Sequence, residues 1–452
     1  MAWLVAIIGS VAGFLFGYDE GIIAGSLDLI KTQFNMSHTS VGVMTSALPF
    51  GALFGSMLVG SILASKVVKH IGRKKCLSFA GALFFIGALG ATFAEAEGIL
   101  IISRFILGIA IGIAAVTTPL YLAETAPAHL RGAMVAIYQL AITIGIVCAY
   151  SVNLLLINYG SWRAMFASSL IPSTILVFGV LLLPESPRWL LSIGKRDEAK
   201  SALQKLHKEN SQAEFMEIEQ TLSHEPPKGD WHALFRKPLL PVLSLGMILF
   251  CLQQLSGINV IIYYAPEIFK NMGFSSSTGQ ILATMGIGLV NMVITILAVF
   301  YVDRIGRRKL LLFGFAGTGI SLAVLGLLSY HQVSFLAYLS VICLTVYIIA
   351  FAISLGPIPY IAMSEIFPLY VRGGGMGLSS ISNWGFNGIV VFMFPIMFHA
   401  FGVEYTFLIY AAICFVGLMY TYIYMPETKN LSLEFIEEYV MSGKPLRWLG
   451  RR

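Results

Sequence analysis

Twelve long apolar runs dominate the sequence, and they limit the possible folds more than any other feature. About 20 consecutive apolar residues suffice for one helix to cross a bilayer. Only 12% of the 452 residues are charged, whereas a soluble domain carries about 25%. The sequence therefore predicts an all-α membrane protein. Its expected spans are residues 2–26, 42–64, 76–94, 98–121, 132–156, 163–183, 239–265, 277–301, 309–329, 334–361, 374–400 and 404–424.

The basic residues predict the orientation of these spans. Of the 29 Lys and Arg residues, all but Lys31, Arg104, Arg163 and Lys270 fall on the side where twelve crossings place the N-terminus. Loops rich in Lys and Arg stay in the cytoplasm, so both termini are expected there. The basic cytoplasmic segments then explain the net charge of +6, and no nucleic-acid partner is expected. The five Cys and eight His show no ligand spacing, so neither a metal nor a cofactor is expected.

Three motifs occur twice, in the same order and at nearly the same separation. Such a repeat indicates two related halves of six helices, and parallel halves with a site at the midplane are typical of transporters. The pairs are "GRKK" at 72–75 with "GRRK" at 306–309, "ETAPAHLRG" at 124–132 with "EIFPLYVRG" at 365–373, and "PES" at 184–186 with "PET" at 426–428.

The repeat and the one long polar segment predict four parts of the chain. The polar segment has apolar residues at helical spacing, which indicates short amphipathic helices on the cytoplasmic side. The expected parts are an N-terminal half at 1–184, a linker at 185–238, a C-terminal half at 239–424 and a cytoplasmic tail at 425–452.

The repeated motifs also place acids and bases together at the inner helix ends. Ion pairs between them could hold that side closed in one state and release it in another. The alternative is that the charges only fix topology and cap helices. The predicted latch residues are Arg73, Glu124, Arg131, Arg188, Asp303, Arg307, Arg308, Glu365 and Arg372.

These motifs resemble those of the sugar porter family of the major facilitator superfamily, from the first helix to "PETKN" at 426–430. The resemblance implies the major facilitator fold and sugar transport by alternating access. Members include bacterial sugar–proton symporters, such as those for xylose, and animal facilitative glucose transporters. The resemblance also rests on "FGYD" at 16–19, "PLYLAETAPAHLRG" at 119–132, "PESPRWL" at 184–190, "QQLSGINVIIYY" at 253–264, "VDRIGRR" at 302–308, "GPIPY" at 356–360 and "SEIFPLYVRG" at 364–373.

The resemblance implies a sugar-binding site made of amides and aromatic rings. An amide offers both a donor and an acceptor without net charge, and an aromatic face can cover the C–H face of a sugar. Gly257 could break its helix and turn the amides on both sides inward. The alternative for a membrane amide is a hydrogen bond between helices. The implied residues are Gln139, Gln253, Gln254, Asn259, Tyr263, Tyr264, Asn291, Tyr360, Asn383 and Trp384.

Three positions depart from the family pattern. Lys69 stands where the family usually has Asp or Asn, which predicts a weaker latch in the first half. Tyr360 replaces the Trp of many relatives, so the aromatic face is smaller and carries a hydroxyl. Glu20 stands where many relatives have a small polar residue, and the sequence assigns no role to it.

Asp19 lies within the first apolar run, and Arg104 is the one basic residue predicted inside a span. The resemblance implies that they pair, because the helices that carry them are neighbours in this superfamily. Proton-coupled members have Asp at this position, whereas the animal uniporters typically have Asn. Burial disfavours a charged carboxylate and a guanidinium favours it, so separating the pair makes the carboxylate take up a proton. The alternative is a static ion pair that only holds the fold.

The resulting hypothesis is a symporter that imports a hexose or pentose with protons across the plasma or inner membrane. A sugar uniporter is the nearest alternative. A nutrient sensor built on a transporter body is a further one, but such sensors usually carry a long cytoplasmic tail. The sequence shows no nucleophile–base set and no cofactor loop, so an enzyme is not expected.

Overall fold

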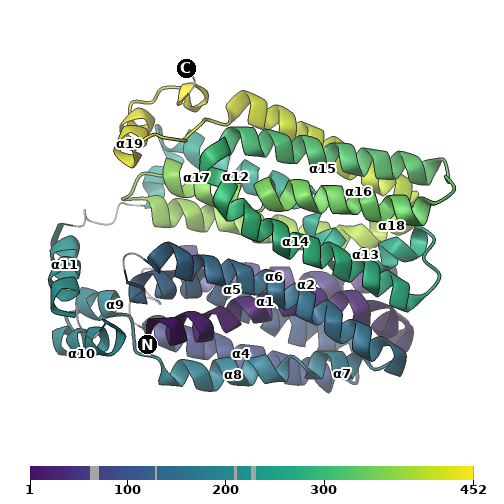
Figure 1. Ribbon diagram of the computed structural model, residues 1–452, viewed down its shortest axis with the longest axis horizontal. Coiled ribbons are helices and arrows are strands. Elements are labelled where there is room, and N and C mark those ends of the chain that lie inside the picture. Colours follow the sequence, from purple (N-terminus) through teal and green to yellow (C-terminus); the bar gives the residue numbers. More distant parts are fainter. Residues whose placement is uncertain (62–70, 128–129, 208–210, 225–230, 451–452) are drawn as a thin grey trace. The chain divides into compact units, whose positions relative to one another are not determined.

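The computed structural model describes residues 1–61, 71–127, 130–207, 211–224 and 231–450, and the regular structure in these ranges is helical. Eleven of the described helices are long and apolar enough to cross a membrane. This confirms an all-helical, multi-pass membrane protein. The first elements are α1 (Ala2–Phe34), α2 (His38–Ser56), η1 (Met57–Ser61), α4 (Arg73–Thr92), α5 (Glu97–Thr125), α6 (Arg131–Leu156), η3 (Ile157–Tyr159), α7 (Trp162–Ala167) and α8 (Leu170–Leu182) (Figure 1).

Short helices follow, and then a second series of long ones. The short helices are α9 (Pro187–Ser192), α10 (Arg196–His207), α11 (Ser211–His224) and η4 (Trp231–Phe235). The later elements are α12 (Leu240–Leu255), α13 (Ile258–Asn271), α14 (Ser277–Ile305), α15 (Arg307–Tyr330), α16 (Leu336–Ala350), η5 (Phe351–Leu355), α17 (Ile358–Ile366), α18 (Arg372–Tyr424), α19 (Leu433–Met441) and η6 (Leu446–Trp448).

The last long element explains why eleven candidate spans correspond to twelve predicted ones. Helix α18 is 53 residues long, but Gly402 inside it has a φ of 81° and a non-helical conformation. Two helices therefore meet at this residue. The predicted spans at 374–400 and 404–424 lie on its two sides.

By packing, the described chain forms two compact units. The first comprises Met1–Asp19, Ala47–Ala149 and Arg163–Lys228. In it α4 packs against α5 and α8. Helix α5 approaches α2 closely, since a Cβ atom on Gly108 would lie 2.1 Å from the carbonyl oxygen of Leu48. Small residues at this contact let two membrane helices touch through their backbones.

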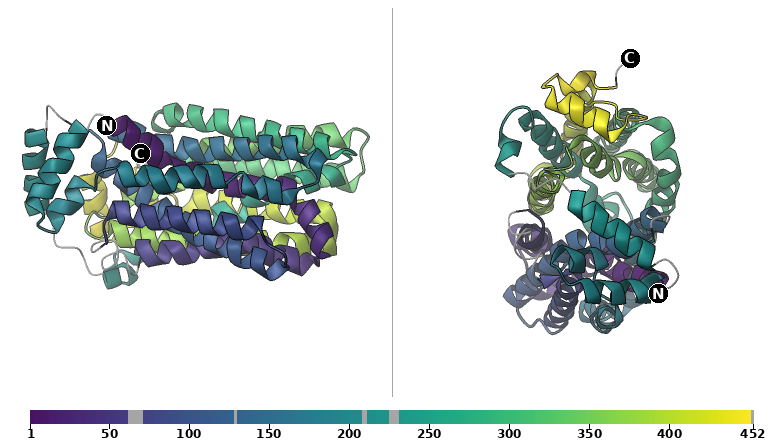
Figure 2. Two further views of the ribbon diagram at one scale, coloured as in Figure 1. Left: turned by 90° about the horizontal axis from the view of Figure 1, so that it is seen from below. Right: turned by 90° about the vertical axis from the view of Figure 1, so that its left-hand side faces the viewer.

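Helices α9, α10 and α11 of the linker also belong to the first unit, whereas η4 belongs to the second. Helices α9, α10 and α11 pack on one another, and they lie together in both views of Figure 2. The three helices bury their apolar faces in one small core that they share. This core consists of Trp189, Leu190, Ala199, Ala202, Leu203 and Phe215.

The second unit comprises Glu20–Ser46, Tyr150–Trp162 and Gly229–Arg452. In it α15 packs against α16 and α18, and α12 packs against α18. The later parts of α1 and α6 and the first part of α2 belong to this unit, and polar contacts join them to α13. The Tyr150 hydroxyl donates to the carbonyl oxygen of Ile262 at 2.9 Å, and the hydroxyls of Thr45 and Tyr264 are 2.7 Å apart. The boundaries of the packing units therefore differ from those of the two repeat halves. The division into halves stays a prediction.

The predicted helix break at Gly257 is present. Helix α12 ends at Leu255 and α13 begins at Ile258, and Gly257 between them has a φ of 94°. A residue with a Cβ atom adopts this left-handed conformation only at a cost. The break turns the last residues of α12 and the first residues of α13 toward the same region.

Candidate functional site

Four buried amides meet around the break between α12 and α13. Gln253 and Gln254 end α12, Asn259 begins α13, and Asn383 comes from α18. Asn383 Nδ2 donates to Gln253 Oε1 at 2.8 Å, and Asn259 Nδ2 donates to Gln254 Oε1 at 2.7 Å. The structure thus brings together four of the predicted sugar-site residues.

The two glutamines have different surroundings. Gln253 also donates from Nε2 to the carbonyl oxygen of Leu355 at 2.6 Å, so both ends of its amide are used. This side chain ties α12 to α18 and η5, as expected for a hydrogen bond between helices. In contrast, the bond between Gln254 and Asn259 does not use Gln254 Nε2 or Asn259 Oδ1. These atoms are one donor and one acceptor for a hydroxyl group.

The predicted aromatic residues are placed around the same region of the second unit. Tyr360, in the first turn of α17, is 43% exposed and lies edge-on to Phe250, with ring centroids 4.7 Å apart. Trp384 is buried beside Asn383 on α18, and Tyr263 is fully buried on α13. The Tyr264 hydroxyl donates to the carbonyl oxygen of Val391 at 3.0 Å, which ties α13 to α18.

Two predicted residues are not joined to this cluster. Gln139 lies on α6 in the first unit with an exposed side chain, and Asn291 is half-buried on α14. Their roles stay predictions. Sequence reasoning missed Asn387, which is 3% exposed and whose Oδ1 makes no hydrogen bond to the described residues. It lies one turn after Asn383, and this i to i+4 spacing was the available signal.

Asp19 and Arg104 lie in the first unit and are 1% and 0% exposed. The charge of Arg104 acts on the Asp19 carboxylate. Neither carboxylate oxygen of Asp19 makes a hydrogen bond within the described part of the chain. A membrane carboxylate without such bonds is costly unless it is protonated or compensated by a charge.

At one end of the second unit, the repeated motifs form a single polar network. Arg307 Nη2 lies 2.7 Å from Glu365 Oε1, and Thr428 Oγ1 donates to Glu365 Oε2 at 2.6 Å. The carboxylate of Glu427 accepts the backbone N–H groups of Arg307 at 3.0 Å and Arg308 at 3.2 Å. Glu427 thereby caps the start of α15, where a negative charge is favourable.

The first unit contains the matching network. Arg73 Nη2 lies 2.9 Å from Glu124 Oε1, and Ser186 Oγ donates to Glu124 Oε2 at 2.5 Å. Glu185 accepts the backbone N–H groups of Arg73 and Lys74, each at 3.0 Å, and so caps α4. Both expected arrangements, ion pairing and helix capping, are therefore present. The capping glutamates Glu185 and Glu427 lie in the repeated motif, but sequence reasoning assigned them no role.

The remaining latch candidates make other contacts. Arg372 Nε donates to the carbonyl oxygen of Phe367 at 3.1 Å, within its own turn. Arg308 Nη2 donates to the carbonyl oxygen of Tyr422 at 2.9 Å, and Arg188 is half-buried on α9. The side chains of Arg131 and Asp303, as well as Lys69, lie outside the described part of the structure.

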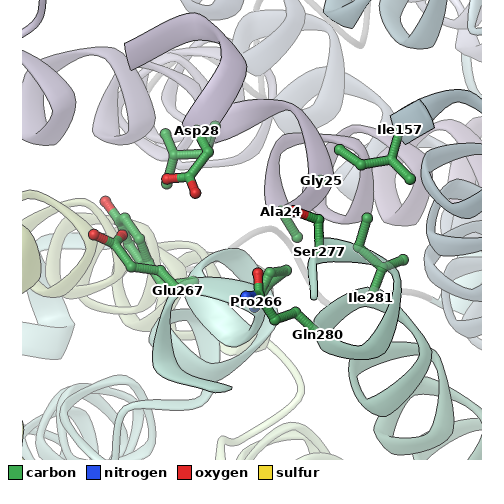
Figure 3. Close-up of a pocket in the computed structure, with 11 residues that line it drawn as sticks. Ala24, Gly25, Asp28, Ile157, Pro266, Glu267, Ser277, Gln280 and Ile281 are labelled. Atoms are coloured by element: carbon green, nitrogen blue, oxygen red, sulfur yellow. The ribbon is translucent and has the colours of Figure 1, made fainter. Parts of the chain in front are cut away.

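A second set of charges joins α1 to α13 in the second unit. Lys270 Nζ lies 2.9 Å from Asp28 Oδ2, and Lys31 Nζ lies 3.7 Å from Glu267 Oε1. Asp28 and Glu267 line a small pocket with Pro266 and residues of α14 (Figure 3). We refer to these four charged residues as the α1–α13 charge cluster.

Comparison with known proteins places these features in context. A family model described as "Sugar (and other) transporter" matches residues 5–439. A D-xylose transporter of Levilactobacillus brevis is 39% identical over 437 residues, which cover 96% of this chain and 94% of that protein. A galactose-proton symporter of Escherichia coli strain K12 is 38% identical over 458 residues, which cover 100% and 97% of the two chains.

The fold is likewise similar to a solved structure. The inward open conformation of the xylose transporter XylE from Escherichia coli matches with a TM-score of 0.84 at 29% sequence identity. The match covers 97% of this chain and 99% of that one. At these values the similarity extends over nearly the whole of both chains.

Proposed function

Because the chain belongs to the sugar transporter family, which is a family of transporters and not of enzymes, we propose that it is a monosaccharide–proton symporter. The observation that carries this proposal is the buried Asp19, whose carboxylate is compensated by the charge of Arg104 and makes no hydrogen bond to the described residues. Such a carboxylate can exchange a buried charge for a proton. The proton is the coupling ion, and Asp19 and Arg104 are the coupling residues.

The sugar occupies the region between the α12–α13 break and α18. Gln254 and Asn259 bind hydroxyl groups through the amide atoms that their mutual bond leaves unused, and Asn387 supplies a further acceptor. Tyr360 covers the apolar face of the ring. Relatives named for xylose and for galactose support a pentose or a hexose as the substrate. Asn291 completes the site in this proposal, and Gln139 stays a predicted sugar contact.

Alternating access requires that the two sides of the membrane open in turn. We assign the two Arg–Glu networks to the cytoplasmic side, because most of the Lys and Arg residues of the sequence belong to that side. Both termini are then cytoplasmic, and the α1–α13 charge cluster lies on the opposite side. The surrounding bilayer is the plasma or inner membrane, as for a nutrient importer.

One experiment separates the proposal from a uniporter. Sugar added to weakly buffered cells that produce the protein is expected to raise the external pH, because each sugar carries protons inward. A uniporter moves labelled sugar at the same rate without alkalinisation. Cells that lack the protein are the control, and sugar uptake without a pH change would reject proton coupling.

Replacing Gln254 with Ala is expected to weaken sugar binding several-fold. The change removes the donor that Gln254 Nε2 offers to a sugar hydroxyl and the acceptor that holds Asn259, and one such bond contributes about 1 kcal/mol. Calorimetry with the purified protein measures the effect. The matched control is Gln253→Ala, whose main expected effect is a lower melting temperature, because its amide ties α12 to α18 and η5. Unchanged affinity in a folded Gln254→Ala variant would remove this residue from the site.

Replacing Asp28 with Asn is expected to open the α1–α13 contact slightly more often. The side chains of Lys270 and Asp28 are 55% and 49% exposed, and exposed pairs contribute about 0.5 kcal/mol. The reactivity of a single cysteine at the buried Ala24, which lines the pocket, should rise about twofold by this argument. High salt should produce the same rise in the parent protein. Equal labelling rates under all conditions would show that the cluster does not hold this side closed.

A further inference from the structure

One face of α1 is directed toward α13 over about two helical turns. Ala24, Asp28 and Lys31 lie at i, i+4 and i+7, so they share a face. Asp28 and Lys31 pair with Lys270 and Glu267, and Ala24 lines the pocket between the helices (Figure 3). The face of α1 that points toward α13 is therefore fixed by described contacts.

The opposing face of α13 is defined in the same way. Asn259, Tyr263, Glu267 and Lys270 follow one another at spacings of four, four and three residues, so they too share a face. Glu267 and Lys270 contact α1, whereas Asn259 bonds to Gln254 at the other end of the helix. The same face thus runs from the α1–α13 charge cluster to the amides.

Glu20 continues the α1 face by one more turn, since it precedes Ala24 by four residues. On α13, Asn259 lies one turn before Tyr263. Both helices rise by 1.5 Å per residue, so the same number of residues along each helix covers the same distance. The pairs Asp28–Lys270 and Lys31–Glu267 give an average offset of 239 positions between the two helices, so we expect Glu20 near the level of Asn259. Glu20 is 5% exposed, and its charge acts on Tyr150 and on the half-exposed Tyr360.

We infer that the Glu20 carboxylate binds a hydroxyl group of the transported sugar and helps to set which sugar is preferred. The inference rests on the proposed function of the amide site. A carboxylate accepts hydrogen bonds but donates none, so it selects a hydroxyl that is oriented toward it. Charged acceptors bind about twice as strongly as neutral ones. An ionisable side chain at membrane depth also calls for a functional account, and Asp19 already carries the proposed proton.

The test measures binding of a transported sugar and its monodeoxy analogues to purified protein by calorimetry. For one hydroxyl position, the parent protein is expected to bind the deoxy analogue at least tenfold more weakly than the sugar. Glu20→Ala should reduce this ratio to below threefold, and Glu20→Gln should give an intermediate ratio. The Gln variant preserves the volume of the side chain, so it tests the proposal even where the Ala variant does not fold.

Asp28→Asn is the matched control, because it removes a carboxylate from the same face of α1 two turns away. It is expected to change the affinities for all analogues by a common factor. Equal ratios at every hydroxyl position in the parent and both Glu20 variants would overturn the assignment of Glu20. A parent protein that binds no monosaccharide would instead reject the proposed function itself.

Discussion

Replacing Asp19 with Asn is expected to abolish sugar accumulation driven by a proton gradient while sugar-for-sugar exchange continues. Asn keeps the size of the side chain but does not titrate. Asp19 is fully buried beside the charge of Arg104, and in the proposed mechanism uptake of its proton separates the pair. In vesicles with an imposed gradient, the internal sugar concentration should rise only to the external one. Transport by the variant should also lose its dependence on pH.

Exchange is the necessary control for this experiment. The substitution leaves Arg104 facing a neutral partner, and breaking a buried pair costs about 3 kcal/mol. A variant that fails to fold would lose both exchange and accumulation, whereas an uncoupled variant loses accumulation alone. Asp28→Asn, on the same helix but in an exposed pair, should still accumulate sugar. Accumulation by the Asp19→Asn variant would show that the coupling proton binds elsewhere.

The sequence predicts those parts of the fold that depend on local patterns. Long apolar runs specify the spans, because the membrane requires each backbone polar group to be bonded within its helix. Gly257 predicts the break between α12 and α13, since its φ of 94° is a conformation that glycine adopts readily. Gly402 likewise divides α18. In these places one residue and its neighbours determine the local structure.

The partners of the polar side chains depend on contacts that are remote in sequence. Arg372 lies in the same motif as Glu365, yet it bonds to the carbonyl oxygen of Phe367. Glu365 pairs instead with Arg307, which is 58 residues away. Gln253 resembles Gln254 in the sequence, but only the structure shows that its amide is used up between helices. Sequence patterns thus identified candidate residues without specifying which atoms meet.

Replacing Glu365 with Gln is expected to destabilise the polar network of the second unit strongly. Glu365 holds the Arg307 guanidinium at 2.7 Å and accepts the Thr428 hydroxyl. The two charged side chains are only 20% and 11% exposed, so the remaining Arg307 charge is poorly solvated. Removing one partner of such a pair costs about 3 kcal/mol. The melting temperature of the purified protein should fall by several degrees.

The first unit supplies a matched variant, and the linker supplies a control. Glu124→Gln removes the corresponding partner of Arg73, whose side chain is 14% exposed, and it should have a similar effect. Glu198→Gln breaks the pair of Lys195 and Glu198, whose side chains are 51% and 59% exposed. That change should cost about 0.5 kcal/mol or less. A Glu365→Gln variant as stable as Glu198→Gln would contradict the importance of the network.

A second measurement decides whether the network is a latch or only a brace within its unit. If it holds the cytoplasmic side closed, Glu365→Gln should favour the inward-open state. The cysteine at Ala24, which lies on the opposite side in this proposal, should then react more slowly. If the network only braces the helix ends, the melting temperature falls but the labelling rate of the folded protein stays unchanged. Because Arg307, Glu365 and Thr428 all belong to the second unit, stability alone cannot separate the two roles. The labelling rate separates them because it depends on which side is open.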